Sequence, residues 1–218
     1  MPAPKYMLGR KVGMTHVFRE DGEQIPVTVI RSGPMKVAQV KTAERDGYLA
    51  LQLAYEPCRE KVISKPENGH LKSIGAHRFL REVRLDDPVE LADLEVGAEF
   101  DISVFEPGDR VDVIGTVKGR GFQGVIKAHN FQGKRRTHGC MNQRGPGSIG
   151  MHSQPGEVLK GQRLPTHLGD VRATVRNLEV IKVDVDNQCL VIRGAIPGPR
   201  SGFVIIRAAG AYRARQES

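Results

Sequence analysis

Short segments of alternating or β-branched residues dominate the pattern of hydrophobic and polar positions at both ends of the chain. The pattern predicts strands at residues 7–18, 25–30, 37–41, 49–54, 101–105, 110–117, 172–175, 178–185, 189–192 and 203–207. Turns containing Asp-Gly follow the first and third of these segments, and the polar run 184–188 predicts a hairpin. Short strands separated by such turns are typical of a small antiparallel barrel, so the predicted fold class is mainly β.

The pattern changes between residues 57 and 100. Pro57 and Pro66 interrupt it, and residues 69–84 have the composition of one or two short helices. We therefore expect a mixed α+β insertion over residues 57–100. The barrel is expected to use residues 1–56, 101–117 and 166–210, and residues 211–218 are expected to form a polar tail.

A long loop is predicted over residues 118–165, because neither helical nor strand periodicity is present from about residue 130 to 165. Loops of this length inside a compact domain are usually functional or disordered. The surrounding segment 115–165 holds 11 of the 25 glycines, few apolar side chains and charges of like sign. Such a segment cannot bury enough apolar surface to fold alone, so we expect an outside partner to order it.

Charge is unevenly distributed along the 218 residues, whose net value is +8. Residues 115–165 contain nine basic residues and one acid, whereas residues 86–114 contain one basic residue and ten acids. One segment thus carries as much net charge as the entire chain. A basic balance indicates a polyanionic partner but does not bear on the fold. Aromatic residues make up only 5% and Trp is absent, so little aromatic stacking on that partner is expected.

Several classes of protein are disfavoured by the sequence. No apolar run approaches 18 residues, so no membrane-spanning helix is expected, and the N-terminal residues do not resemble a signal peptide. Cys58, Cys140 and Cys189 lie far apart without a CxxC pair, which argues against disulfides or structural zinc and is typical of a reducing cytosol. The seven histidines form no HxH or HExxH motif. We therefore expect no metal, cofactor, catalytic residue or small-molecule substrate.

The densest motif covers residues 118–127, KGRGFQGVIK. Its glycines allow the backbone to approach phosphates closely, and Lys118, Arg120 and Lys127 would supply the neutralising charge. Residues 119–124 also match the GxGxxG pattern of dinucleotide-binding proteins. That pattern requires a strand, a turn and a helix, whereas Val125-Ile126 has the character of a strand. A flexible, solvated turn is the remaining alternative.

A second basic cluster, KRRTHG at residues 134–139, is predicted at the loop tip. A solvated charge run is the usual alternative, but further cations adjoin the cluster on glycine-rich chain. Arg binds phosphate bidentately or stacks on unpaired bases, and His donates to phosphate or to the 2′-OH. The predicted RNA-binding residues are Lys118, Arg120, Lys127, His129, Lys134, Arg135, Arg136, His138, Arg144, Lys160, Arg163 and His167.

Structured RNA is the favoured partner, because no helix-turn-helix, zinc finger or RNP aromatic motif for modular base readout is present. An unstructured cationic loop can thread between RNA helices and follow their backbones. Two alternatives stay open. One is an enzyme that uses Cys140 and His138 on nucleic acid, although Glu157 is the only acid in the loop. The other is a free basic RNA chaperone.

The chain also resembles a known family, the bacterial-type large-subunit ribosomal protein L-three (uL-three) family. The motifs that carry the resemblance are LGRKVGMT at 8–15, PVTVI at 26–30, KGRGFQGVIK at 118–127, HG at 138–139, PGSIG at 146–150, PG at 155–156, KG at 160–161, NLEV at 177–180 and GAIPG at 194–198. They occur in family order over essentially the whole chain. The chain departs from the family pattern at residues 164–169, where LPTHLG replaces the usual MAGHMG, at Ala128 and Glu157, where a basic residue is common, and at the added cations 134–136.

The resemblance implies a translation-protein-type β-barrel with a mixed α+β insertion and a long extended loop. It implies direct binding to 23S-type large-subunit rRNA near its 3′ domain, and an early role in subunit assembly. The loop would run toward the peptidyl transferase centre and support the RNA there without performing chemistry. The implied partners include neighbouring large-subunit proteins, and the implied location is a ribosome, either cytoplasmic or organellar.

Overall fold

The structure is a computed structural model that describes residues 5–85 and 95–210. The chain divides into two compact units. The first combines Met1–Thr116 with Arg172–Ser218, and the second is Val117–Val171. The acidic residues 86–94 and the predicted tail 211–218 lie outside the described residues.

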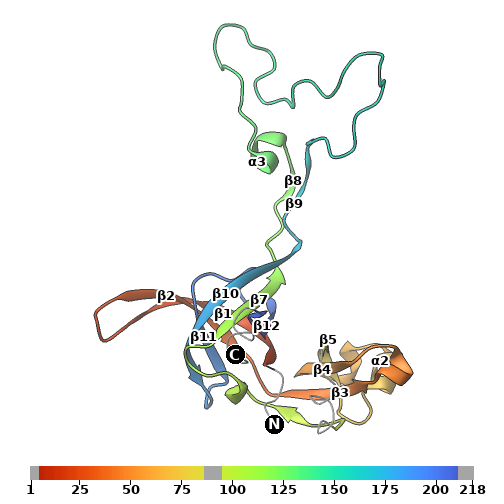
Figure 1. The fold of residues 1–218 in the computed structure, drawn as a ribbon, viewed down its shortest axis with the longest axis vertical. Helices are drawn as coiled ribbons and strands as arrows, with labels where there is room; N and C mark the ends of the chain where they lie inside the picture. The colour runs from red at the N-terminus through yellow and green to blue at the C-terminus, as the bar shows by residue number, and fades with distance from the viewer. Residues whose placement is uncertain (1–4, 86–94, 211–218) are drawn as a thin grey trace. The chain divides into compact units, whose positions relative to one another are not determined.

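The first unit contains a closed barrel of six strands (Figure 1). In barrel order the strands are β1 (Tyr6–Phe18), β12 (Phe203–Ala208), β7 (Arg110–Thr116), β10 (Arg172–Asp184), β11 (Cys189–Arg193) and β2 (Gln24–Arg31). Every neighbouring pair is antiparallel. The predicted mainly β fold class with a small antiparallel barrel is therefore confirmed.

The turns of the barrel follow the local chemistry of the sequence. Gly22 joins β1 to β2 with φ of 79°, a conformation that glycine adopts at little cost. In the predicted hairpin between β10 and β11, the Asp184 carboxylate accepts hydrogen bonds from Asn187 N at 3.1 Å and Asn187 Nδ2 at 2.9 Å. These bonds hold the pKa of Asp184 below its ordinary value. β10 is one strand rather than the two predicted, because a shift in register between Val175 and Leu178 accommodates the irregular pattern there.

A second sheet in the same unit has the order β5 (His77–Arg84), β4 (Ala50–Pro57), β3 (Met35–Lys41) and β6 (Glu99–Phe100). Residues 35–56, expected in the barrel, contribute instead the two middle strands of this sheet. Their alternation predicted strands but contained no information about which strands they pair with. The helical elements around the sheet are α1 (Ala43–Asp46), η1 (Glu60–Val62), α2 (Lys65–His70) and η3 (Ile102–Val104).

Two local predictions are wrong. Residues 77–84, expected to be helical, form strand β5 because they pair along β4 and bury Val83. Residues 101–105, expected to be a strand, contain the 3₁₀ helix η3. The Asp101 carboxylate caps this helix by accepting from Ile102 N at 2.7 Å, while Ile102 and Phe105 are buried.

One hydrophobic core joins the barrel to the second sheet. It contains barrel residues such as Leu8, Val113 and Ile206 and second-sheet residues such as Met35 and Leu51. These side chains are almost wholly buried, so aliphatic packing replaces the missing Trp residues. The first unit therefore has the burial that a self-standing domain requires.

Candidate nucleic-acid interface

A short antiparallel stem closes the base of the second unit. β8 (Gly121–Gln123) pairs with β9 (Thr166–Leu168), placing Phe122 opposite His167 with their rings edge to face at 5.7 Å. Further backbone bonds run from Arg120 N to Leu168 O at 2.7 Å and from Val117 N to Val171 O at 3.0 Å. The stem holds the two ends of the long loop together.

Gly169 makes the stem possible. Its φ is 79°, and a Cβ atom there would overlap the carbonyl oxygen of Lys118 on the facing chain. Only glycine allows both this left-handed conformation and this close approach. Gly169 is not among the predicted site residues, although it is the last residue of the segment 164–169 where the family pattern is altered.

The helix α3 (Val125–His129) follows the stem, so the prediction of a strand at Val125-Ile126 is wrong. Gly124 is the N-cap residue of the helix, and Asn130, whose φ of 57° is left-handed, is the C-cap residue. Two apolar residues are too few to distinguish a strand from one turn of helix. The dinucleotide interpretation still fails, because β8 is in a two-stranded antiparallel sheet and not in a parallel βαβ unit.

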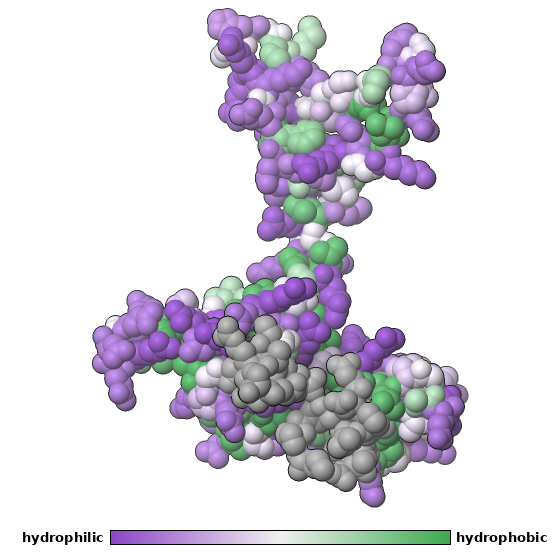
Figure 2. Space-filling view, in the orientation of Figure 1, coloured by the Kyte–Doolittle hydropathy of each residue, from purple (hydrophilic) through white to green (hydrophobic). Residues whose placement is uncertain are grey.

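Residues 130–165 contain no helix or strand, as their lack of periodicity predicts. Within residues 117–171, all of which the structure describes, Val125 is the only buried side chain. Ile126, Phe131 and Leu168 are half-buried, and several other apolar side chains are exposed, including Phe122 at 66% and Met151 at 75% of full exposure. The second unit therefore has no hydrophobic core of its own. Figure 2 shows the predominance of hydrophilic residues on this unit.

The predicted RNA-binding residues all lie in this second unit. Eleven of the twelve are exposed, and His129 is half-buried with Nε2 2.9 Å from the Leu164 carbonyl oxygen. Phe122, which lies on the stem beside His167, is not among the predicted RNA-binding residues. An aromatic residue within a basic, glycine-rich motif was the available signal, because aromatic rings stack on unpaired bases.

The two units differ in how many of their charged side chains form ion pairs. Within residues 5–85 and 95–210, the nine Lys and Arg side chains of the loop form no ion pair. The described ion pairs all lie in the first unit; examples are Lys5–Asp109 at 2.9 Å and Arg207–Asp112 at 3.2 Å. The first unit thus neutralises many of its own charges, whereas the second presents unpaired cations to solvent.

The geometry does not favour catalysis in the loop. Cys140 Sγ lies 3.8 Å from the Asn142 carbonyl oxygen, and the described residues show no hydrogen bond between Cys140 and His138. The described part of the chain also contains no group of three or more His, Cys, Asp or Glu residues arranged to hold a metal ion.

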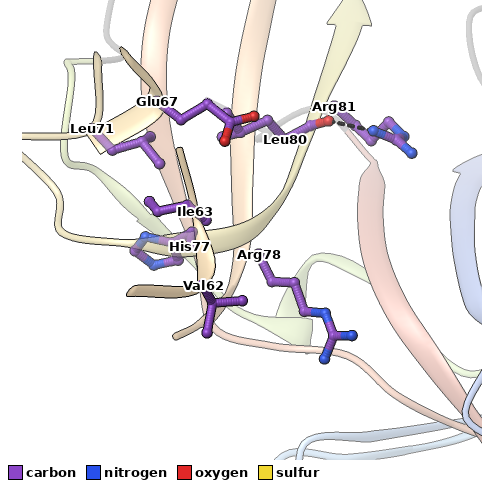
Figure 3. Close-up of a pocket in the computed structure, with 8 residues that line it drawn as sticks. All are labelled: Val62, Ile63, Glu67, Leu71, His77, Arg78, Leu80 and Arg81. Carbon is purple, nitrogen blue, oxygen red and sulfur yellow. Dashed lines mark hydrogen bonds between the residues drawn. The ribbon is translucent and has the colours of Figure 1, made fainter. Parts of the chain in front are cut away.

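A pocket of about 400 Å³ lies in the first unit between α2 and β5 (Figure 3). Its two acid–base groups already make local hydrogen bonds. His77 Nδ1 lies 2.8 Å from the Gly75 carbonyl oxygen, and the Glu67 carboxylate accepts from Ser64 N at 3.0 Å. The bonds from Ser64 also lower the pKa of Glu67. The pocket therefore offers structural hydrogen bonds rather than an arranged acid and base.

No helix among the described residues is long and apolar enough to cross a membrane.

Comparison with known proteins gives a consistent result. Residues 84–189 match the family model described as Ribosomal protein L3. The chain is 48% identical over 212 residues to "Large ribosomal subunit protein uL3" of Pelotomaculum thermopropionicum, covering 96% of this chain and 99% of the relative. It is 50% identical over 204 residues to the protein of the same name from Thioalkalivibrio sulfidiphilus, covering 92% and 95%.

Proposed function

The chain belongs to the ribosomal protein L3 family, and from this premise we propose that it is a non-enzymatic, structural component of the large ribosomal subunit that binds large-subunit rRNA directly. The observation that carries the proposal is the positive charge of the loop, which has no hydrophobic core and forms no ion pair with the described residues. Nine cations that form no ion pair with the described residues 5–85 and 95–210, on a segment with one buried side chain, favour a partner that supplies both negative charge and surface.

The glycines of the loop support close backbone approach to that partner. Gly119, Gly124 and Gly150 do not have left-handed φ values, and a Cβ at each would meet at most ordinary van der Waals contacts. The fold of the protein alone therefore does not require glycine at these positions. A phosphate or sugar packed directly against the backbone would explain why glycine occupies these positions.

We assign the barrel to the subunit surface and the loop to the interior of the rRNA, near the peptidyl transferase centre. There the loop neutralises crowded phosphates and supports RNA geometry, and its ordering on RNA contributes to early subunit assembly. The barrel side contacts neighbouring large-subunit proteins. The site of action is a ribosome of the cytoplasm or of an organelle.

Crosslinking of residues 118–167 to rRNA in purified large subunits tests this function directly. We expect adducts with rRNA at several of the twelve predicted positions. A companion variant lacking residues 130–157 should retain a folded barrel, because these residues contribute nothing to its core, but should impair subunit maturation or peptidyl transfer. Absence of RNA adducts, or normal subunits from the deletion variant, would refute the proposal.

Two measurements separate the alternatives. Replacing Cys140 and His138 with Ala should abolish turnover if the protein is a nucleic-acid enzyme, whereas the ribosomal function predicts no turnover to lose. Sedimentation of cell extract distinguishes a free chaperone, since a ribosomal protein should migrate with large subunits and resist moderate salt washing.

A further inference from the structure

The β1–β2 hairpin projects beyond the barrel (Figure 1). β1 pairs with β12 only as far as Arg10, and the last backbone bonds on that side run from Lys11 N to Gly202 O at 3.0 Å and from Ser201 N to Lys11 O at 2.7 Å. Beyond this point β1 continues to Phe18, paired with β2 alone. Among the described residues, the backbone of residues 12–18 therefore has one free strand edge.

This free edge has an unusual composition. Residues 12–18, VGMTHVF, contain no Lys, Arg, Asp, Glu or Pro, although charged residues make up 27% of the chain. Natural proteins normally protect exposed edges with charges, prolines, bulges or short strands, because unpaired N–H and C=O groups recruit other chains. The bulge in β1 lies between Lys11 and Gly13, at the base of the segment, and leaves regular pairing from Gly13 to Phe18.

The other long edge strand of the described structure provides a contrast. β5 pairs with β4 only, and it carries Arg78, Arg81, Glu82 and Arg84 within eight residues. The charges that protect β5 are absent from the distal half of β1. Protection of edges is therefore used in this protein, and the β1 edge is an exception.

An exposed apolar face accompanies the edge. Met14, His16 and Phe18 alternate along β1 and so share one face of the hairpin, with exposed Pro26 opposite His16. Met14 and Phe18 are 48% and 64% exposed. On the opposite face Ile25 and Val27 are fully buried, although Thr15, the partner of Val27, is exposed. The hairpin thus buries apolar side chains on one face and exposes Met14 and Phe18 on the other.

Two ion pairs hold the hairpin in place. Arg19 binds Glu179 of β10 at 3.1 Å, and Arg193 of β11 lies 3.6 Å from Glu23. The turn residues Glu20 and Asp21 are exposed and, within residues 5–85 and 95–210, form no ion pair. The projecting end is therefore locally acidic, and this charge repels RNA and attracts a basic chain.

From the free edge, the apolar face and the acidic turn together, we propose that residues 12–18 bind a basic, extended segment of another protein, which adds a strand to β1. Nucleic acid cannot pair with the backbone of a strand edge, whereas an added polypeptide strand satisfies it and covers alternate side chains. The segment places apolar side chains on Met14 and Phe18 and Lys or Arg near Glu20 and Asp21. The inference rests on the proposed function only in that a ribosomal subunit supplies such a partner.

Photocrosslinking in intact large subunits tests the proposal. p-Benzoylphenylalanine is placed at position 18, and at Val185 as a control, since Val185 is an exposed apolar residue in the β10–β11 turn. We expect a position-18 adduct that resists nuclease, is destroyed by protease, and joins this chain to a Lys- or Arg-rich peptide of a second protein. A nuclease-sensitive adduct, an adduct with a second copy of this chain, or a yield no higher than at position 185 would overturn the proposal.

A charge variant gives an independent readout. The double substitution Met14→Lys and Phe18→Lys should lower the subunit occupancy of the crosslinked partner by about tenfold or more, since apolar burial is lost and charge repulsion is added. Val185→Lys should leave that occupancy unchanged. Binding of the isolated double variant to large-subunit rRNA should stay within about twofold of the unsubstituted protein, because the hairpin is not the RNA site. Unchanged occupancy would refute strand addition, whereas absent rRNA binding by the unsubstituted protein would refute the proposed function instead.

Discussion

The proposed binding to RNA should depend on salt concentration, because the cations without ion pairs among the described residues are concentrated in the second unit. If each of the nine loop cations neutralises one phosphate, log K should fall with log salt concentration with a slope of about −6 to −8. A rise from 50 to 200 mM salt should then weaken binding roughly 10⁴-fold. Replacing Lys134, Arg135 and Arg136 with Gln leaves six cations, a slope of about −4 to −5, and a loss of roughly 10³-fold over the same range.

Filter binding to large-subunit rRNA at four or more salt concentrations measures these slopes. The matched control replaces Arg19, Arg193 and Arg207 with Gln, since each of these arginines is in an ion pair of the first unit. The control removes the same formal charge, but its slope should equal that of the unsubstituted protein. Equal slopes for the loop variant and the unsubstituted protein, or an equal loss in the control, would contradict the reasoning.

Three further predictions concern single residues. Gly124→Ala should change the free energy of unfolding by less than about 1 kcal/mol, because the added methyl group meets nothing in the protein. It should lower rRNA affinity about tenfold or more, because the methyl group would obstruct close approach of the RNA. Unchanged affinity in filter binding would contradict this explanation. Gly169→Ala should instead open the stem, because its Cβ overlaps the Lys118 carbonyl oxygen; hydrogen exchange should accelerate in β8 and β9 and not in the barrel. The hydrogen bond from Lys41 lowers the pKa of Glu82. The contribution of this pair to stability is therefore full above the unfolded pKa of about 4.3 and is lost as pH falls through the lower folded pKa. Chemical denaturation of Glu82→Gln at several pH values should show a smaller loss of stability at acidic pH than in the unsubstituted protein.

The loop illustrates what can be predicted from sequence with little help from tertiary structure. Nine cations, eleven glycines and the absence of periodicity in residues 115–165 are properties of the chain itself. They predicted an exposed segment without regular structure between residues 130 and 165, and this prediction is confirmed. The roles of the twelve selected residues in RNA binding stay predictions, since their exposure makes them available without showing what they contact.

Alternation and turn chemistry along the sequence determined the mainly β class, most of the barrel strands and the hairpin at Asp184, because these signals act over a few neighbouring residues. Only the tertiary structure decided that residues 35–56 belong to a second sheet and not to the barrel, that residues 77–84 pair along β4, and that β1 extends beyond its pairing with β12. Strand partners are selected by burial and pairing between segments far apart in sequence, which local periodicity does not record. The free edge of residues 12–18 has the same origin. Its uncharged composition is visible in the sequence, but its exposure arises because β12 pairs with β1 only as far as Arg10.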